Sequence, residues 1–156
     1  MSSPDIAVEL VAPLACEVGE NPLWHPEANN LFFLDITKGT VHAYSAAMQN
    51  YFVAAQTRIT GGFTLQRDGS LLLFQDGRIA SLARDNVVRE VACGLCPGND
   101  RFNDVIADPE GRIFAGAMGG NGKRWSLIQP SIQPSNGAPA CSRQSWPSTA
   151  TAIGAF

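Results

Sequence analysis

The sequence predicts an all-β protein built from repeated units. Two observations support this fold class. Short apolar segments recur between Glu20 and Met118, and turn sequences rich in Pro, Gly, Asp and Asn separate them. No window of about 15 residues carries the 3.6-residue hydrophobic period of an amphipathic helix. At 156 residues, the chain has room for about one domain of ~100–200 residues.

A polar turn followed by an apolar strand occurs three times along the chain. The strands begin at Leu31, Leu71 and Ile113, so the repeat is about 40 residues long. Hairpin sequences fit between them, and the expected strands are residues 31–35, 40–44, 71–74, 78–82 and 113–116. A repeat of this length with several short strands is typical of the blades of a β-propeller. A β-sandwich, whose strands are also regularly spaced, is the alternative.

Composition narrows the class of partner. Apolar residues make up 45% of the chain and charged residues 16%, which suits a globular core rather than a disordered or coiled-coil protein. A net charge of -3 argues against a nucleic-acid partner, which would require an excess of Lys and Arg. No apolar run approaches the ~20 residues of a membrane span. Residues 1–5 lack the basic start of an export signal, so we expect a cytoplasmic protein.

The last part of the chain has a different composition. All 14 acidic residues lie at or before Glu110, and residues 121–156 contain four Pro, six Ser and no acidic residue. The repeated turn-and-strand phrase is also missing there. Such a composition cannot bury enough surface to offset the entropy lost on ordering. We therefore expect a folded, partial β-propeller in residues 1–120 and a disordered tail in residues 121–156.

Three groups of motifs resemble one known family. They are GENPLWHPE at residues 19–27, LFFLDI at residues 31–36, and RFND at residues 101–104 followed by DPEGRIFAGAM at residues 108–118. In this order and spacing they resemble the SMP-30/gluconolactonase/LRE family, which includes regucalcin. The resemblance covers about residues 7–120. It implies a six-bladed β-propeller, of which this chain supplies roughly the first two to three blades.

The resemblance also implies a function, the metal-dependent hydrolysis of sugar-type lactones. In the family one divalent metal ion sits on the propeller axis. Glu20 would be a metal ligand, and Arg101 and Asn103 would contact the substrate or metal-bound water in the central cavity. The ion would be Ca²⁺, Zn²⁺, Mn²⁺ or Mg²⁺, and the harder of these cations prefer oxygen ligands. Arg101 could then stabilise a developing oxyanion or hold sugar hydroxyls.

The same resemblance marks what is missing. The other two protein ligands of the family, an Asn and an Asp that also serves as candidate general base, come from later blades and have no counterpart here. We therefore expect the truncated chain to be impaired or inactive as a lactonase. The alternative is a non-catalytic propeller-type fragment for binding or scaffolding, or a small β domain with a genuine linker. Simpler interpretations of Glu20, Arg101 and Asn103 are surface or turn residues.

Two structural expectations follow from a partial propeller. One apolar blade face and a row of strand-edge groups should be left uncovered.

A frameshift in the gene would explain the different composition of the tail. Trp125 begins a segment where the family usually has a strand such as Gly-Ala-Leu-Tyr. Codons that encode residues 125–129 can also encode that strand when they are translated in a reading frame shifted by one nucleotide. We therefore place the frameshift near codon 125. Sequencing the gene tests this hypothesis.

Overall fold

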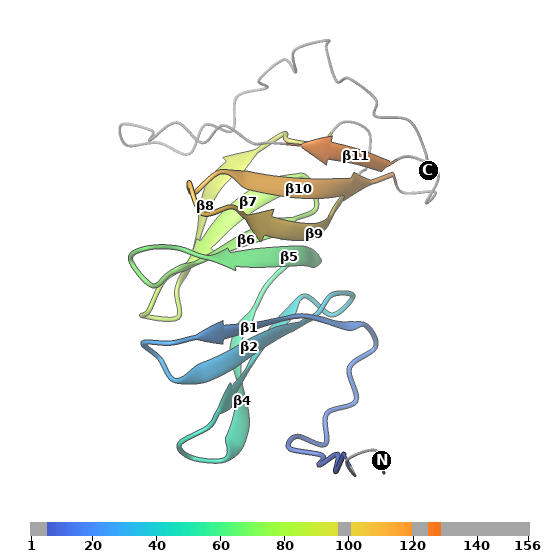
Figure 1. The fold of residues 1–156 in the computed structure, drawn as a ribbon. Coiled ribbons are helices and arrows are strands. Elements are labelled where there is room, and N and C mark those ends of the chain that lie inside the picture. The colour runs from blue at the N-terminus through green and yellow to red at the C-terminus, as the bar shows by residue number, and fades with distance from the viewer. Residues whose placement is uncertain (1–5, 97–100, 120–124, 129–156) are drawn as a thin grey trace, which may run out of the picture.

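The computed structural model describes residues 6–96, 101–119 and 125–128, the last of these by backbone alone. This part of the chain forms three antiparallel sheets and contains no helix (Figure 1). Correspondingly, the described residues include no helix long and apolar enough to cross a membrane. One strand, β11, falls within residues 121–156; the rest of the predicted disordered tail lies outside the described residues, so that expectation stays a prediction.

Each sheet has the strand order of a propeller blade, with every strand beside the next one in sequence. We call the sheet of β1 (Gly19–His25), β2 (Asn30–Asp35), β3 (Thr40–Ser45) and β4 (Asn50–Gln56) the first blade. The second blade contains β5 (Thr60–Leu65), β6 (Leu71–Gln75), β7 (Arg78–Leu82) and β8 (Val88–Cys93). The third contains β9 (Arg101–Ala107), β10 (Ile113–Met118) and β11 (Trp125–Ile128).

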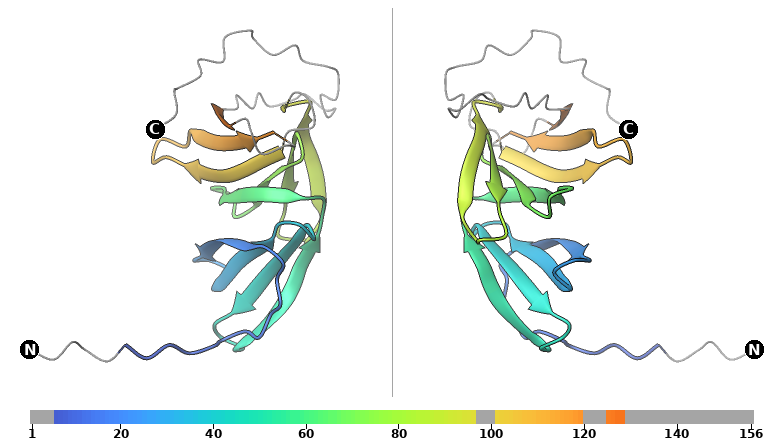
Figure 2. Two further views of the ribbon diagram at one scale, coloured as in Figure 1. Left: turned by 90° about the vertical axis from the view of Figure 1, so that its right-hand side faces the viewer. Right: turned by 90° about the vertical axis from the view of Figure 1, so that its left-hand side faces the viewer.

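The three blades pack side by side, as Figure 2 shows. The five strands expected from the sequence correspond to β2, β3, β6, β7 and β10, and the turn-and-strand phrase recurs at the second strand of every blade. A β-sandwich would instead place two sheets face to face. Three successive blades of this kind agree with the repeat prediction.

The second blade is apolar on both faces, and both are buried. On one face Leu71 and Leu73 belong to a core shared with Leu34 and Val41 of the first blade. On the other, Phe74 packs edge-on against Phe102 of the third blade, with ring centroids 5.3 Å apart. Because side chains alternate along a strand, neighbouring residues of β6 serve opposite interfaces. A blade of this kind is stable only between two neighbours.

Close packing of the first strands requires glycine. A Cβ atom added to Gly61 of β5 would lie 1.8 Å from the backbone oxygen of Phe102 in β9. A Cβ atom on Gly62 would lie 2.8 Å from the Val105 side chain. Since a backbone oxygen cannot move aside as a flexible side chain can, the second and third blades meet here only because residues 61 and 62 have no side chain.

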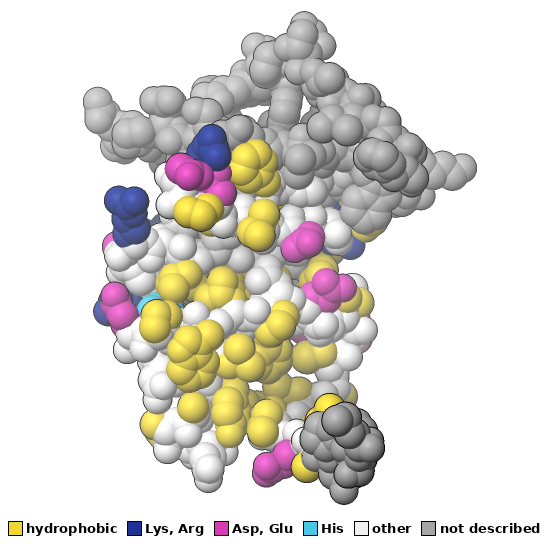
Figure 3. Space-filling view, in the orientation of Figure 1, with side chains coloured by type: hydrophobic (Ala, Val, Ile, Leu, Met, Phe, Trp, Pro, Cys, Tyr) yellow, Lys and Arg dark blue, Asp and Glu magenta, His cyan; other side chains and the backbone are white. Residues whose placement is uncertain are grey.

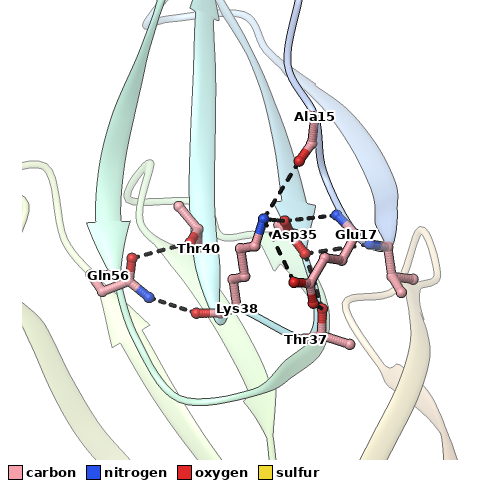
Figure 4. A network of polar contacts seen from close by, with 8 residues as sticks. Ala15, Glu17, Asp35, Thr37, Lys38, Thr40 and Gln56 are labelled. Carbon is pink, nitrogen blue, oxygen red and sulfur yellow. Dashed lines mark hydrogen bonds and ion pairs between the residues drawn. The ribbon is translucent and has the colours of Figure 1, made fainter.

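Asp35 holds the start of β1 in place (Figure 4). Its carboxylate accepts hydrogen bonds from the backbone N–H of Glu17, at 3.0 Å, and of Val18, at 3.4 Å. Lys38 Nζ lies 3.5 Å from the same carboxylate, and the Thr37 hydroxyl also donates to it. The segment that leads into Gly19 is therefore fixed to the end of β2.

The electrostatics of Asp35 follow from this arrangement. Asp35 is 1% exposed, and burial alone would raise its pKa. The backbone hydrogen bonds from Glu17 and Val18, together with the charge of Lys38, outweigh burial and hold the pKa below its ordinary value. Its stabilising effect is therefore fully present above the ordinary carboxyl pKa of 3.8 and is lost as the pH falls through the lower folded-state pKa.

We expect Asp35→Asn to lower the free energy of unfolding at pH 7 by about 1.5–3 kcal/mol, because charge-assisted hydrogen bonds to a buried carboxylate are lost. Urea denaturation measures this change. At pH 3, below the ordinary carboxyl pKa of 3.8, the difference between variant and wild type should shrink, since the unfolded wild-type chain then binds more protons at this carboxyl than the folded chain does. Glu110→Gln, on an exposed turn, is the control and should change stability by less than about 0.5 kcal/mol. Equal stability of Asp35→Asn and wild type at pH 7 would contradict this assignment.

We expect Gly61→Ala to destabilise the protein by about 1–3 kcal/mol or more, because the added methyl group forces β5 away from β9. Thermal unfolding followed by circular dichroism gives the shift. Gly19→Ala is the matched control, since its Cβ atom would meet nothing closer than the Cys16 Cβ atom at 3.3 Å. If both variants melt together with wild type, the close approach of β5 and β9 does not exist in solution.

Candidate functional site

The predicted site residues lie at the starts of neighbouring strands. The first strands of the three blades, β1, β5 and β9, run side by side and point the same way in Figure 1. Glu20 is the second residue of β1, and Arg101 and Asn103 are the first and third residues of β9. The fold thus brings the strand ends that carry these residues to one edge of the molecule, with the start of β5 between them.

All three strands are irregular at this edge. The pairing of β1 with β2 shifts between Glu20 and Leu23, and that of β5 with β6 shifts between Thr60 and Gly62. In β9 the shift leaves Asp104 without a partner on β10. A β-bulge bends its strand and re-aims the neighbouring side chains, which is why bulges often lie beside functional sites. Similar shifts occur between β3 and β4 and between β7 and β8, so the bulges are a repeated feature of the blades, and at this edge they lie beside the predicted site residues.

The start of β5 contacts both β1, which carries Glu20, and β9, which carries Arg101 and Asn103. Asn21, next to Glu20, accepts a hydrogen bond of 2.8 Å from the Phe63 backbone N–H through its Oδ1 atom. Two residues earlier, Gly61 lies against the backbone that joins Phe102 to Asn103. Residues 61–63 of β5 therefore contact β1 next to Glu20 and β9 between Arg101 and Asn103. This contact fixes the position of β1 relative to β9.

Asn21 was missed by sequence reasoning. It adopts a left-handed backbone conformation, with φ at 56°, and Asp104 does the same in β9 with φ at 57°. Asn and Asp tolerate this conformation better than most residues, so the type of residue gave a weak signal. The hydrogen-bond partner lies 42 residues away in the chain, however, and no local pattern could have indicated it.

Arg101 and Asn103 lie together. Arg101 Nη1 donates to Asn103 Oδ1 at 3.2 Å and to the Phe102 carbonyl oxygen at 3.1 Å. Both side chains are half-buried. Arg101 forms no ion pair with any residue of the described part of the chain. A half-buried guanidinium beside an amide suits a ligand oxygen that carries or develops negative charge.

Glu20 stands apart from this pair. Its side chain is exposed and forms no hydrogen bond or ion pair with any described residue. Its β2 partner is Leu34, which packs toward the second blade, so Glu20 belongs to the same side of the first blade. The structure therefore places Glu20 at the same edge as Arg101 and Asn103 without joining them directly.

The donors present are of the right kind for a divalent cation but too few. A carboxylate and amide oxygens are the ligands that Ca²⁺ and Mg²⁺ prefer. Over residues 6–96, 101–119 and 125–128, however, no group of three or more His, Cys, Asp or Glu side chains could hold a metal ion. Glu20 could contribute one ligand to such a site, and the rest would have to come from elsewhere in a ring.

A separate cavity of about 290 Å³ lies between the first and second blades, at the other end of β1. Glu20 and His25 are five residues apart along the strand, roughly 16 Å at ~3.3 Å per residue. His25, which lines the cavity, is buried and uses both nitrogens: Nε2–H donates to the Gly69 carbonyl, and Nδ1 accepts from the Ala28 N–H. A fully bonded imidazole is a structural group, so this cavity offers no catalytic base.

Comparison with known proteins agrees with the motifs. The pattern of the SMP-30/Gluconolactonase/LRE-like region matches residues 18–129. The pentonolactonase XacC of Haloferax volcanii is 39% identical over 114 residues, which cover 72% of this chain and 38% of that protein. Regucalcin of Xenopus laevis is 30% identical over 123 residues, with the same coverage of both chains. The chain thus spans about two fifths of the length of these relatives.

Solved structures give the same fold. A calcium-binding regucalcin from Agrobacterium tumefaciens superposes with a TM-score of 0.69 at 19% identity, covering 76% of this chain and 42% of that one. A gluconolactonase from Xanthomonas campestris gives 0.60 at 17% identity, with coverage of 78% and 45%. These neighbours are β-propellers, so the predicted fold class is confirmed. Because the family pattern matches residues 18–129, which are most of this chain, the chain belongs to the SMP-30/gluconolactonase/LRE-like family.

Proposed function

We propose that this chain forms one half of the lactone-binding end of a lactone-hydrolysing β-propeller. The observation that carries the proposal is the position of Glu20, Arg101 and Asn103 at one edge, at the starts of β1 and β9, with both strands docked on residues 61–63 of β5. Two relatives named pentonolactonase and putative sugar lactone lactonase support a sugar lactone as the class of substrate.

Each residue has a role in this proposal. Glu20 would provide one carboxylate ligand to a divalent cation. Such a cation, when bound, polarises a carbonyl oxygen and acidifies a bound water. Arg101 donates hydrogen bonds to the lactone carbonyl oxygen, where negative charge develops as water attacks. Asn103 orients the Arg101 guanidinium through their 3.2 Å hydrogen bond and offers its amide N–H to sugar hydroxyls.

In this proposal the group that removes a proton from the attacking water is the Asp that the family resemblance assigns to a later blade. General base catalysis requires a carboxylate or imidazole within about 3 Å of the water. Among the described residues, neither His25 nor His42 lies at this edge, since His25 ends β1 and His42 lies within β3. We therefore propose that the isolated chain binds lactone-like ligands but hydrolyses them weakly or not at all.

We expect weak binding of a divalent cation that depends on Glu20. Isothermal titration with Ca²⁺, Mn²⁺ and Zn²⁺ should give at least about a tenfold loss of affinity in Glu20→Gln, because one charged ligand becomes neutral. Glu27→Gln is the matched control: Glu27 is also an exposed carboxylate of the first blade, but it pairs with Arg84 at the other end of β1. Equal binding by wild type and Glu20→Gln would remove the metal role.

We also expect D-gluconate, the stable product of gluconolactone hydrolysis, to bind through Arg101. Arg101→Met keeps the side-chain length and removes the charge, and should weaken binding by about tenfold or more. Arg67→Met, at an exposed turn residue without an ion pair among the described residues, should leave binding unchanged. A gluconolactone assay should show a rate close to the uncatalysed one. Rapid turnover that survives Glu20→Gln and Arg101→Met would contradict the proposal.

A further inference from the structure

The cavity of about 290 Å³ between the first and second blades has no role in the proposed function. Its floor is apolar, because Leu71 and Leu82 of the second blade and Ala54 of the first blade line it and are all buried. Phe32 and Phe52 line it as well, and they lie on the same side of the first blade, in one cross-strand row. Both walls of the cavity therefore belong to blades that the structure describes.

Small residues leave this space open. Ala28, Ala54 and Ala83 contribute only methyl groups to the lining, and Gly69 contributes no side chain. Gly69 has a φ of 79°, and a Cβ atom there would collide with the Arg84 guanidinium, so a larger residue is excluded at this position. Protein interiors contain few voids larger than a water molecule. A space of this size between two blades is therefore suited to a bound molecule.

Arg84 joins the two blades at the exposed rim of the cavity. Its Nη2 atom donates to the Glu27 carboxylate of the first blade, and its Nε atom donates to the Asp68 carbonyl oxygen at 3.1 Å. Nη1 forms no hydrogen bond with a described residue, so its N–H groups are available to a ligand. Asn30 and Asn86 also line the cavity, and their amide groups have no hydrogen-bond partner among the described residues.

The volume and the lining together select a class of ligand. An apolar cavity of about 150 Å³ binds benzene, so roughly twice that volume suits two fused rings. Phe32 and Phe52 favour a flat, aromatic ring system. Because Glu27 already neutralises Arg84, an anionic ligand gains little at the rim. A hydroxyl or carbonyl oxygen can still accept a hydrogen bond from Arg84 Nη1 or from the Asn30 amide.

We propose that this cavity binds a neutral bicyclic aromatic molecule that carries a hydroxyl or carbonyl group. The rings pack against Phe32, Leu71 and Leu82, and the polar group lies at the rim beside Arg84. The inference does not rest on the proposed function, because Glu20 lies at the opposite end of β1 from the cavity. Binding of the aromatic molecule and of D-gluconate can be measured separately.

A second apolar surface has to be distinguished from the cavity. Figure 3 shows a broad hydrophobic patch over the lower part of the molecule, where β1, β2 and β4 lie. Val53, between Phe52 and Ala54 in β4, points to the side of the sheet away from the cavity and is 57% exposed. An aromatic probe can adsorb on such a surface. The variants below therefore alter the cavity and leave this surface intact.

Titration of the full chain with 2-naphthol tests the proposal, because this probe has two fused rings and one hydroxyl and is neutral at pH 7. The backbone amide signals of Leu71, Leu82 and Ala83 in NMR spectra report binding at the cavity. We expect these signals to shift in a saturable way, with a Kd of the order of 0.1–1 mM. The absence of a saturable shift would overturn the proposal.

Ala28→Trp places a large side chain at the rim and should weaken 2-naphthol binding at least about fivefold. Ala28 is exposed on the turn between β1 and β2, so circular dichroism should show unchanged folding. Ala46→Trp is the matched control, since Ala46 is exposed on the turn between β3 and β4 and does not line the cavity. Equal binding by Ala28→Trp and wild type would place the probe outside the cavity and would overturn the proposal.

The charge of the ligand is tested with 2-naphthoate, a carboxylate of similar size. Wild type should bind it at least about threefold more weakly than 2-naphthol, because Glu27 neutralises Arg84. Glu27→Gln leaves the Arg84 charge unpaired and should reverse this order. If wild type binds 2-naphthoate more tightly than 2-naphthol, the cavity is an anion site and the proposal is wrong. If Glu27→Gln keeps the wild-type order, the polar group does not lie beside Arg84.

Discussion

Every blade of this protein is a sheet with two apolar faces, and the rest of the structure depends on covering both. A sheet that faces water on one side alternates apolar and polar residues, whereas LLLF of β6 is buried throughout. Burying such a strand stabilises by about 25 cal/mol per Å² of apolar surface, but only if sheets lie on both sides. The fold is therefore set by contacts between blades as much as by pairing within them.

The parts of the fold that the sequence predicted are those governed by local chemistry. Turn residues followed by an apolar run located β2, β6 and β10. The first strands were harder to predict. β5 contains Gly61 and Gly62, which disfavour a strand in isolation, and β9 begins with a polar sequence resembling a loop. Both are strands because neighbouring blades hold them.

The candidate site was likewise predicted only in part, because some of its features depend on contacts between blades. Glu20, Arg101 and Asn103 were selected through family resemblance, and the structure places them at one edge. Asn21 could not be selected, because its role arises from contact with β5, a strand of another blade. The repeated bulges lie in the pairing of the first and second strands of each blade, and the turn-and-strand pattern gives no sign of them. A site assembled from the starts of successive strands has no contiguous sequence signature. Its ligands are spread over blades, so part of a ring holds part of a site.

Closing the ring would add ligand-bearing residues from other blades to the candidate site. It would also change the solvation of Glu20 and Arg101. In the present chain the Glu20 carboxylate is exposed, and water solvates it at little cost. A surrounding ring would remove part of that water, and a carboxylate then needs a cation or hydrogen-bond donors to remain charged. The same holds for the Arg101 guanidinium, which lacks a described carboxylate partner and would favour an anionic oxygen. Closure of the ring would therefore cover the apolar faces and, in the same step, make the Glu20 carboxylate and the Arg101 guanidinium favour bound ligands.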